Sequence, residues 1–359
     1  MAGAVMKTRT SRVRILFVVL TVCSAALLFQ SQGAVLPINP VIPVVSVDLA
    51  EKPESASRFT PLFPNALTQA GAAQLADQMA VSFTPPATCE TAIDALVADS
   101  SIQSVLLNND VFALYGKPGA NSMGILGQYS LDQIEPIMND FIKQYDDANG
   151  SRGIIPSFYI IYGTCWPEGD IGLLPDGVVQ KYIEFAAARG WYVYLDHQIG
   201  KYSVESAMNR LLPWLKYPNV QLALDPEWRT TKPMQEIGSV TAAEINKAQQ
   251  MMQDYLLANS LPGRRMLVVH QFKPQMILNR DTVRTDFDLV QLIHCADGFG
   301  SPSLKKSTYA LNAQATNIPL KSFKLFLKPT IANAGYDQPL MSPEEVFSLN
   351  PRPYLIMYQ

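Results

Sequence analysis

Short apolar runs recur along the chain, and most of them end in a carboxylate, an imidazole, an amide or a phenol. Amphipathic segments of helical length separate the runs, with start signals such as the capping-box pair Thr241 and Glu244. Strands that alternate with helices form parallel βα units rather than an antiparallel sandwich. The eight runs are residues 111–115, 154–162, 191–197, 220–228, 266–271, 290–297, 322–327 and 354–359. This pattern predicts an α/β fold, a (β/α)8 or TIM barrel.

The polar ends of these runs predict where the functional site lies. In a (β/α)8 barrel the carboxyl ends of all strands meet at one face, and that face carries the chemistry. The candidate site residues are therefore those at or just after the run ends. They are Tyr115, Tyr162, Asp196, His197, Asp225, Glu227, Trp228, His270, Gln271, Asp297 and Lys324.

The N-terminal part of the chain does not follow the barrel pattern. Residues 1–34 predict a signal peptide, or as second choice a membrane anchor, because basic residues precede an uncharged apolar run over 15–29. This run is shorter than the roughly 20 residues of a membrane span. Residues 35–65 are rich in proline and predict an extended leader, and residues 66–359 predict one barrel domain. The last apolar run ends the sequence, so we expect helices within 66–98 to cover the place of the last barrel helix.

Composition and charge narrow the function classes. The chain is 48% hydrophobic and 16% charged, which is typical of a globular protein. Removal of four basic residues with residues 1–34 changes the formal net charge from −3 to about −7. No basic stripe remains, which argues against a nucleic-acid partner. We expect a secreted or cell-envelope protein, with membrane contact only where residues 1–34 are retained.

Three cysteines lie beyond residue 34. Cys89 and Cys165 fall in loop-like sequence, and an exported protein can join such a pair in a disulfide. Cys295 lies within an apolar run and predicts a small buried side chain. No Cys-x-x-Cys pair is present, which argues against a zinc ribbon or a redox motif.

The fourth run contains the sharpest motif, Asp225-Pro-Glu227-Trp228. Residues two apart on a strand face the same side, so Asp225 and Glu227 can both point to the barrel axis. Two carboxyl groups are what glycosidic cleavage requires, one as proton donor and one to stabilise or attack the oxocarbenium-like centre. Trp228 could supply a stacking surface for a sugar ring. The alternative is that both carboxylates hydrogen-bond loops at the barrel rim.

The Asp-x-Glu of this run resembles the end of the chitinase-type glycoside hydrolase motif, Asp-x-x-Asp-x-Asp-x-Glu. Asp225 and Glu227 match it, whereas Val220 and Ala223 stand at its upstream acidic positions. The retaining glycosidases with a nucleophilic glutamate on strand seven fit no better, because that run carries Lys324 and no carboxylate.

A second resemblance covers most of residues 110–359. The motifs Asp-Pro-Glu-Trp, Val-His-Gln-Phe (269–272), Asp-Gly-Phe-Gly (297–300) and Phe-Lys-Leu-Phe (323–326) together resemble a group of uncharacterised secreted bacterial barrel proteins. This resemblance implies an exported barrel and brings no activity.

Two of the three histidines, His197 and His270, lie at run ends near Asp196 and Asp297. A histidine beside a carboxylate can move a proton, and such sets also bind catalytic metals. The His-x-His that marks the first strand of many barrel metallohydrolases is absent from run one, so we predict no metal ligands and no cofactor. The aromatic residues Tyr115 and Tyr162 either stack on sugars or pack the rim.

These observations lead to three hypotheses. The first is a secreted glycoside-hydrolase-like enzyme acting on extracellular or cell-wall polysaccharide, with Glu227 as acid/base, Asp225 to orient or stabilise, and Asp297 or Asp196 as second carboxylate. Tyr115, Tyr162, His197, Trp228, His270, Gln271 and Lys324 would contact substrate. The second is a non-catalytic barrel that binds carbohydrate or belongs to the cell envelope, favoured by the missing carboxylate on run seven. The third is a metal-dependent hydrolase.

Overall fold

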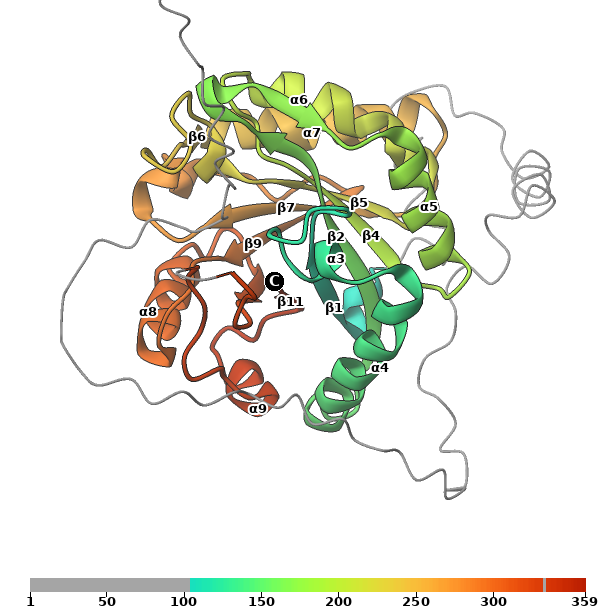
Figure 1. Cartoon of the computed structure of the whole chain (residues 1–359). Helices are drawn as coiled ribbons and strands as arrows, with labels where there is room; N and C mark the ends of the chain where they lie inside the picture. The colour runs from blue at the N-terminus through green and yellow to red at the C-terminus, as the bar shows by residue number, and fades with distance from the viewer. Residues whose placement is uncertain (1–103, 332–333) are drawn as a thin grey trace, which may run out of the picture.

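The structure is a computed structural model, and it describes residues 104–331 and 334–359. Eight parallel strands form a closed barrel, because the first strand pairs with both the second and the last. Figure 1 shows the strands at the centre and the helices around them. The strands are β1 (Asn109–Gly116), β2 (Gly153–Cys165), β4 (Tyr192–His197), β5 (Val220–Leu224), β7 (Arg265–Gln271), β9 (Val290–Ala296), β10 (Leu320–Leu325) and β11 (Leu355–Tyr358). All eight predicted runs contribute a barrel strand in sequential order, so the (β/α)8 prediction is confirmed.

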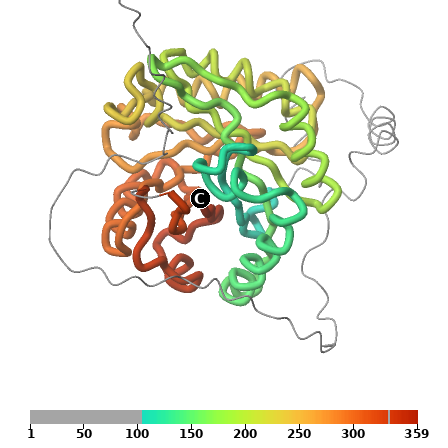
Figure 2. The backbone as a smooth tube through the Cα atoms, in the orientation of Figure 1, coloured from blue at the N-terminus to red at the C-terminus, as the bar shows by residue number. Residues whose placement is uncertain are grey.

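Helices separate most of the strands along the chain, and the backbone tube in Figure 2 can be followed by its colour from one element to the next. The Thr241–Glu244 capping box is present at the start of its helix, as predicted. The helices are α3 (Ile125–Gln128), α4 (Leu131–Ala148), α5 (Asp176–Ala187), α6 (Val204–Leu211), α7 (Ala242–Ala258), α8 (Pro302–Ala313) and α9 (Pro343–Phe347). The 3-10 turns are η2 (Val105–Leu107), η3 (Pro167–Gly169), η4 (Leu212–Lys216), η5 (Pro226–Trp228), η6 (Pro274–Met276) and η7 (Arg280–Thr282).

Three short strands lie outside the barrel. Strand β3 (Ile171–Leu173) pairs antiparallel with the end of β2. Strands β6 (Val240–Thr241) and β8 (Ile277–Leu278) pair with each other. Strand β8 belongs to the connection between β7 and β9, which contains η6 and η7 but no α-helix. This connection is therefore an exception to the alternation of strands and α-helices.

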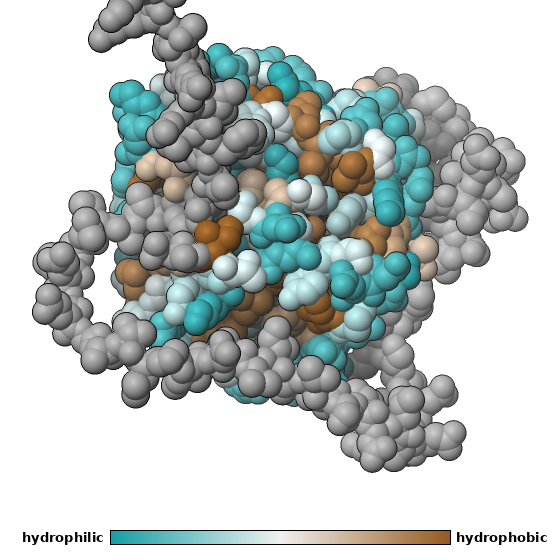
Figure 3. All heavy atoms as spheres, viewed as in Figure 1, coloured by the Kyte–Doolittle hydropathy of each residue, from teal (hydrophilic) through white to brown (hydrophobic). Residues whose placement is uncertain are grey.

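Side chains of each strand alternate between the barrel interior and the surrounding helices. One apolar cluster, including Val111, Tyr159 and Val268, fills the interior. A second cluster, including Leu195 and Leu222, packs between strands and helices. Figure 3 shows that hydrophilic and hydrophobic residues are mixed over the face of the molecule turned to the viewer. A residue's position in this alternation therefore decides whether its side chain points to the barrel axis or to the helices.

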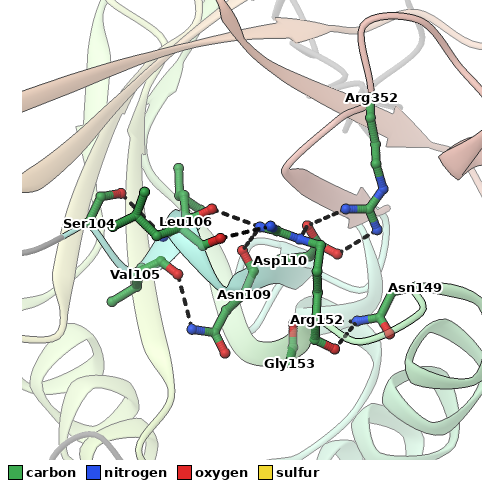
Figure 4. Close-up of polar contacts among 10 residues, drawn as sticks. Ser104, Val105, Leu106, Asn109, Asp110, Asn149, Arg152, Gly153 and Arg352 are labelled. Atoms are coloured by element: carbon green, nitrogen blue, oxygen red, sulfur yellow. Dashed lines mark hydrogen bonds and ion pairs between the residues drawn. The ribbon is translucent and has the colours of Figure 1, made fainter.

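The amino ends of β1, β2 and β11 are joined by an ion-pair cluster that we call the N-terminal clamp (Asp110, Arg152 and Arg352; Figure 4). Asp110 accepts from Arg152 Nε at 2.9 Å and from Arg352 Nη2 at 2.7 Å. Arg152 also donates to the backbone oxygens of residues 106, 107 and 109. The clamp thus links the first two strands to the last, where the barrel closes.

Several predictions concern residues outside the described part of the chain. They are the signal peptide or anchor (1–34), the leader (35–65), the helices within 66–98 and Cys89. Among the described helices, none has the length and apolar character needed to cross a membrane.

Candidate functional site

Seven of the predicted site residues come together at the carboxyl ends of the strands, and we call them the interior cluster. Each is buried, with relative exposure from 0% for Asp196 and His270 to 9% for Glu227. The interior cluster consists of Tyr115 on β1, Asp196 on β4, Asp225 after β5, Glu227 in η5, His270 on β7, Asp297 after β9 and Lys324 on β10. Residues of the apolar interior lie two positions before several of them, for example Val268 before His270. The period of two therefore continues from the interior core into the site.

A hydrogen-bonded chain runs through the cluster around Asp297. Its Oδ2 lies 2.8 Å from Nδ1 of His270 and 3.1 Å from Nζ of Lys324. Its Oδ1 accepts from the backbone N–H of Gly298 at 2.7 Å. The Nε2 of His270 lies 2.7 Å from the hydroxyl of Tyr159. Both oxygens of Asp297 and both ring nitrogens of His270 are thus occupied by protein groups.

A second contact pair lies beside this chain. The hydroxyl of Tyr115 donates to Oδ2 of Asp196 at 3.0 Å, and the ammonium of Lys324 sits 3.9 Å from the centre of the Tyr115 ring. The other oxygen of Asp196 and Oδ1 of Asp225 are buried, and neither has a hydrogen-bond partner among the described residues. An unpartnered buried carboxylate oxygen is costly, so these two oxygens are positions where a ligand hydroxyl would gain a bond.

The electrostatic environment divides the carboxyl groups into two kinds. Burial would raise the pKa of Asp297, but Lys324 and His270 outweigh it and hold the pKa well below its usual range. Burial raises the pKa of Asp225 to about 7, aided by repulsion from Asp196 and Asp297 and opposed by His270 and Lys324. At neutral pH, Asp297 is therefore ionised, whereas Asp225 is near half protonation.

Glu227 and Asp196, like Asp225, have carboxyl groups whose pKa is raised. Burial, followed by the charges of Asp225 and Asp297, raises the pKa of Glu227 well above its usual value. Burial also raises the pKa of Asp196. Glu227 is the most exposed of the four carboxyl groups, so among those with a raised pKa it is the one nearest to solvent.

The cations of the cluster remain charged. Burial would lower the pKa of Lys324, but Asp297 and Asp225 outweigh it and raise the pKa. For His270 burial would again lower the pKa, and the Cys295 sulfur, Asp225 and Asp297 outweigh it, so that its pKa lies well above the usual value. An imidazolium can donate from both nitrogens, which fits its contacts with Asp297 and Tyr159.

Four predicted site residues do not join the cluster. One is Trp228 in η5, and the other three are the strand residues Tyr162, His197 and Gln271. Each of these three lies one position away from an interior residue of its strand, so its side chain faces the helices. Tyr162 packs with Trp214 and His197, with ring centroids 6.0 and 6.4 Å apart. Burial lowers the pKa of His197 to about 3. A position at the end of a strand is therefore not sufficient to place a residue in the interior cluster, because only every second side chain of a strand faces the interior.

Gln271 takes part in a polar network outside the barrel wall. Its Oε1 accepts from Nε2 of His294 at 2.8 Å and from Nη1 of Arg280 at 2.9 Å.

Trp228 is 5% exposed and therefore offers no open stacking surface, whereas Trp166 is 42% exposed. Lys117 lies over the Trp166 ring at 5.1 Å.

Two residues of the site region were not predicted. Tyr159 lies in the middle of its run. It could have been predicted only from its spacing, because it lies two residues before Ile161, which also faces the interior. Lys305 on α8 is fully buried and donates to the backbone oxygens of Gly298 and Lys324, next to a 3.5 Å contact with Asp337. It connects α8 to the two strand ends that carry Asp297 and Lys324, and nothing in the sequence of α8 distinguishes it from Lys306.

The cluster also contains residue types that bind metals. Ligand atoms of Asp225, His270 and Asp297 lie within 4.8 Å of one another. However, both nitrogens of His270 are engaged, and so are both oxygens of Asp297, with the ammonium of Lys324 3.1 Å from Oδ2. A divalent ion would have to displace these contacts and lie beside a buried positive charge. The geometry therefore favours a network of ion pairs over a metal centre.

The cysteines bear on the predicted disulfide. Cys165 is buried and forms no disulfide with another described residue, and burial raises the pKa of its thiol to about 11, which suppresses its reactivity. Cys89, its predicted partner, lies outside the described residues, so the bridge stays a prediction. Cys295 is fully buried in the barrel interior, as predicted.

No family model matches the chain, and no curated protein matches it in sequence. Solved structures with a similar fold include an oxaloacetate acetylhydrolase in complex with its product oxalate, with a TM-score of 0.41, 10% identity and coverage of 75% of this chain and 79% of that one. A GH138 enzyme targeting pectin rhamnogalacturonan II has a TM-score of 0.35 and 11% identity, over 70% of this chain and 34% of that one. An F420-dependent secondary alcohol dehydrogenase in complex with an F420-acetone adduct has a TM-score of 0.29 and 12% identity, over 61% and 69% of the two chains. These enzymes differ in their chemistry, and the matches bring no activity to this chain.

Proposed function

We propose that the protein is a glycoside hydrolase that cleaves a polysaccharide by carboxylate acid/base chemistry at the interior cluster. One observation carries the proposal: buried carboxyl groups at the carboxyl face of the barrel have pKa values shifted in opposite directions. The pKa of Asp297 is lowered and that of Glu227 is raised. Such a divergence is how one site supplies a proton donor and an anion at the same pH.

The roles follow from the directions of these pKa shifts. Glu227 donates its proton to the glycosidic oxygen as the bond to the anomeric carbon breaks, and the leaving group departs as an alcohol. The ionised Asp297 stabilises the positive charge that develops on the sugar ring. His270 and Lys324 keep Asp297 ionised, and Asp225 supports the raised pKa of Glu227. Water then adds to the anomeric carbon and its proton returns to Glu227.

The unpartnered carboxylate oxygens support a substrate rich in hydroxyl groups. Oδ1 of Asp196 and Oδ1 of Asp225 are acceptors without a donor among the described residues. Sugar hydroxyls are donors of the required kind. Tyr115, which donates to Asp196, and Lys324 beside its ring would then help to position the substrate. We place the substrate outside the cell, as a glycan of the extracellular space or the cell wall, in keeping with the predicted export of the chain.

The test is the substitution Glu227→Gln, assayed on a panel of extracellular and cell-wall glycans. We expect turnover to fall by roughly 10²–10⁴-fold, because the amide cannot donate the proton, with little change in thermal stability. The matched control is Glu236→Gln, an exposed glutamate paired with Lys232. Full activity in Glu227→Gln on a substrate that the parent cleaves would sink the assignment.

The same panel separates the two rival functions. A parent protein that binds a glycan without cleaving it would support a carbohydrate-binding barrel. Turnover that disappears on metal chelation and returns with one divalent ion would support a metal-dependent hydrolase, with Asp225, His270 and Asp297 as the ligands.

A further inference from the structure

A concave surface lies on the outside of the barrel, next to the connection between β7 and β9 that has no α-helix. It is lined by Asn279, Arg280 and Asp281 from this connection, and by Gln314, Ala315 and Asn317 from the segment after α8. None of these residues belongs to the interior cluster. The surface is therefore separate from the proposed catalytic site.

Two cations beside this surface have no carboxylate partner among the described residues. Arg280 uses Nη1 to donate to Gln271, while its Nε and Nη2 donate to no described residue. Lys321 is 1% exposed, and its Nζ donates to the backbone oxygens of Asn312 and Ala315 at 2.7 and 2.9 Å. Backbone oxygens satisfy the donors of Lys321 but do not cancel its charge.

The neighbouring groups do not neutralise these cations either. Burial, followed by the charges of Lys321 and Arg280, holds the pKa of His294 well below its usual value, so the imidazole is neutral. Its Nδ1 faces Nζ of Lys321 at 3.4 Å. Asp281 is exposed, where solvent weakens its charge, and it makes no ion pair with Arg280.

A second arginine of the same connection shows what a neutralised site looks like. Arg284 donates from Nε and Nη2 to Asp286 at 2.9 and 2.8 Å. Arg280 has the same two donors unused and opens onto the concave surface. Arginine presents its donors as a planar fork that fits the oxygens of phosphate and related anions.

We propose that this surface binds a tetrahedral oxyanion, the phosphate or sulfate group of a small molecule. Nε and Nη2 of Arg280 donate to two of its oxygens, and Lys321 contributes charge from beneath Ala315. Burial and the charge of Arg280 lower the pKa of Lys321 to about 8. A bound anion stabilises the protonated lysine, so affinity should fall as the pH rises through that value.

The test measures binding to the full chain, so it is independent of the proposed glycosidase activity. Isothermal titration with sodium sulfate and with sodium phosphate at pH 7 and low ionic strength should give saturable binding of one anion per chain, with a matched chloride titration as the blank. Arg280→Gln should weaken binding at least 10-fold, and the control Arg284→Gln should leave it unchanged. Glucose 6-phosphate and glucose 6-sulfate, titrated in parallel, separate a free ion from an esterified one.

Sulfate also tests the pH dependence, because its charge is constant above neutral pH. Its affinity should fall several-fold between pH 7 and pH 9, following Lys321. Equal binding in the parent and Arg280→Gln would overturn the proposal. Binding that chloride reproduces at equal ionic strength would do the same.

Discussion

The two ends of the barrel bury carboxylates in opposite ways. At the amino end, Asp110 is 0% exposed and its oxygens accept from two arginines. At the carboxyl end, four carboxyl groups share Lys324 and His270, and two carboxylate oxygens have no described partner. The first arrangement satisfies a charge, whereas the second leaves charges competing for too few cations.

This difference shows how one fold assigns stability and chemistry to separate places. A buried charge with matched donors ties strands together, and its removal leaves the partner charges uncompensated. A buried carboxyl group without enough donors keeps its proton and can give it to a substrate. In a (β/α)8 barrel the amino face is the expected place for the first use and the carboxyl face for the second.

The largest stability effect should come from Asp110→Asn. The amide cannot neutralise Arg152 and Arg352, so we expect the free energy of unfolding to fall by about 3 kcal/mol. Urea unfolding followed by circular dichroism measures this change. The control is Asp140→Asn on the exposed side of α4, with a change within about 0.5 kcal/mol. If the two variants were equally stable, the clamp would have no role in holding the strands.

The carboxyl end should respond to pH in the opposite sense to a satisfied ion pair. The pKa of Asp225 is raised from 3.8 to about 7, so the folded state binds more protons than the unfolded state between these values. Asp225 therefore costs progressively more stability as the pH rises through this window. We expect Asp225→Asn to be more stable than the parent at pH 8, with the advantage gone near pH 4, in urea unfolding at a series of pH values. A constant difference across this range would contradict the assignment.

The same variant should also change the pH dependence of turnover. The charge of Asp225 helps to raise the pKa of Glu227, so its removal should lower that pKa. Since Glu227 must be protonated to act, the alkaline limb of the activity profile should move to lower pH in Asp225→Asn. An unchanged alkaline limb would mean that the charge of Asp225 does not affect the pKa of the proton donor. A limb that moves to higher pH would assign the donor to another group.

The two ends also differ in how far the sequence predicted them. Apolar runs with polar ends gave the barrel and most of the interior cluster, because hydrophobic periodicity and strand position are local properties. Tyr162, His197 and Gln271 were placed in the site because each lies at a run end, but neighbouring residues of a strand face opposite sides. The N-terminal clamp was not predicted at all. Asp110 and Arg352 are 242 residues apart, and only closure of the barrel brings them together.

The smallest effect should come from the outer half of the clamp, Arg352→Gln. Among the described residues Arg352 donates hydrogen bonds to Asp110 alone, whereas Arg152 also donates to three backbone oxygens in and just before the start of β1. Arg352→Gln should therefore cost about 1 kcal/mol and Arg152→Gln about 2–3 kcal/mol, because the second change also leaves carbonyl groups without donors. In a double-mutant cycle with Asp110→Asn, Arg352 should show a coupling energy close to its whole single effect. A coupling energy near zero would mean that Arg352 acts through its packing on Phe347, whose ring centre lies 4.1 Å from Cζ of Arg352. Closure of the barrel at β11 would then not depend on the carboxylate of Asp110.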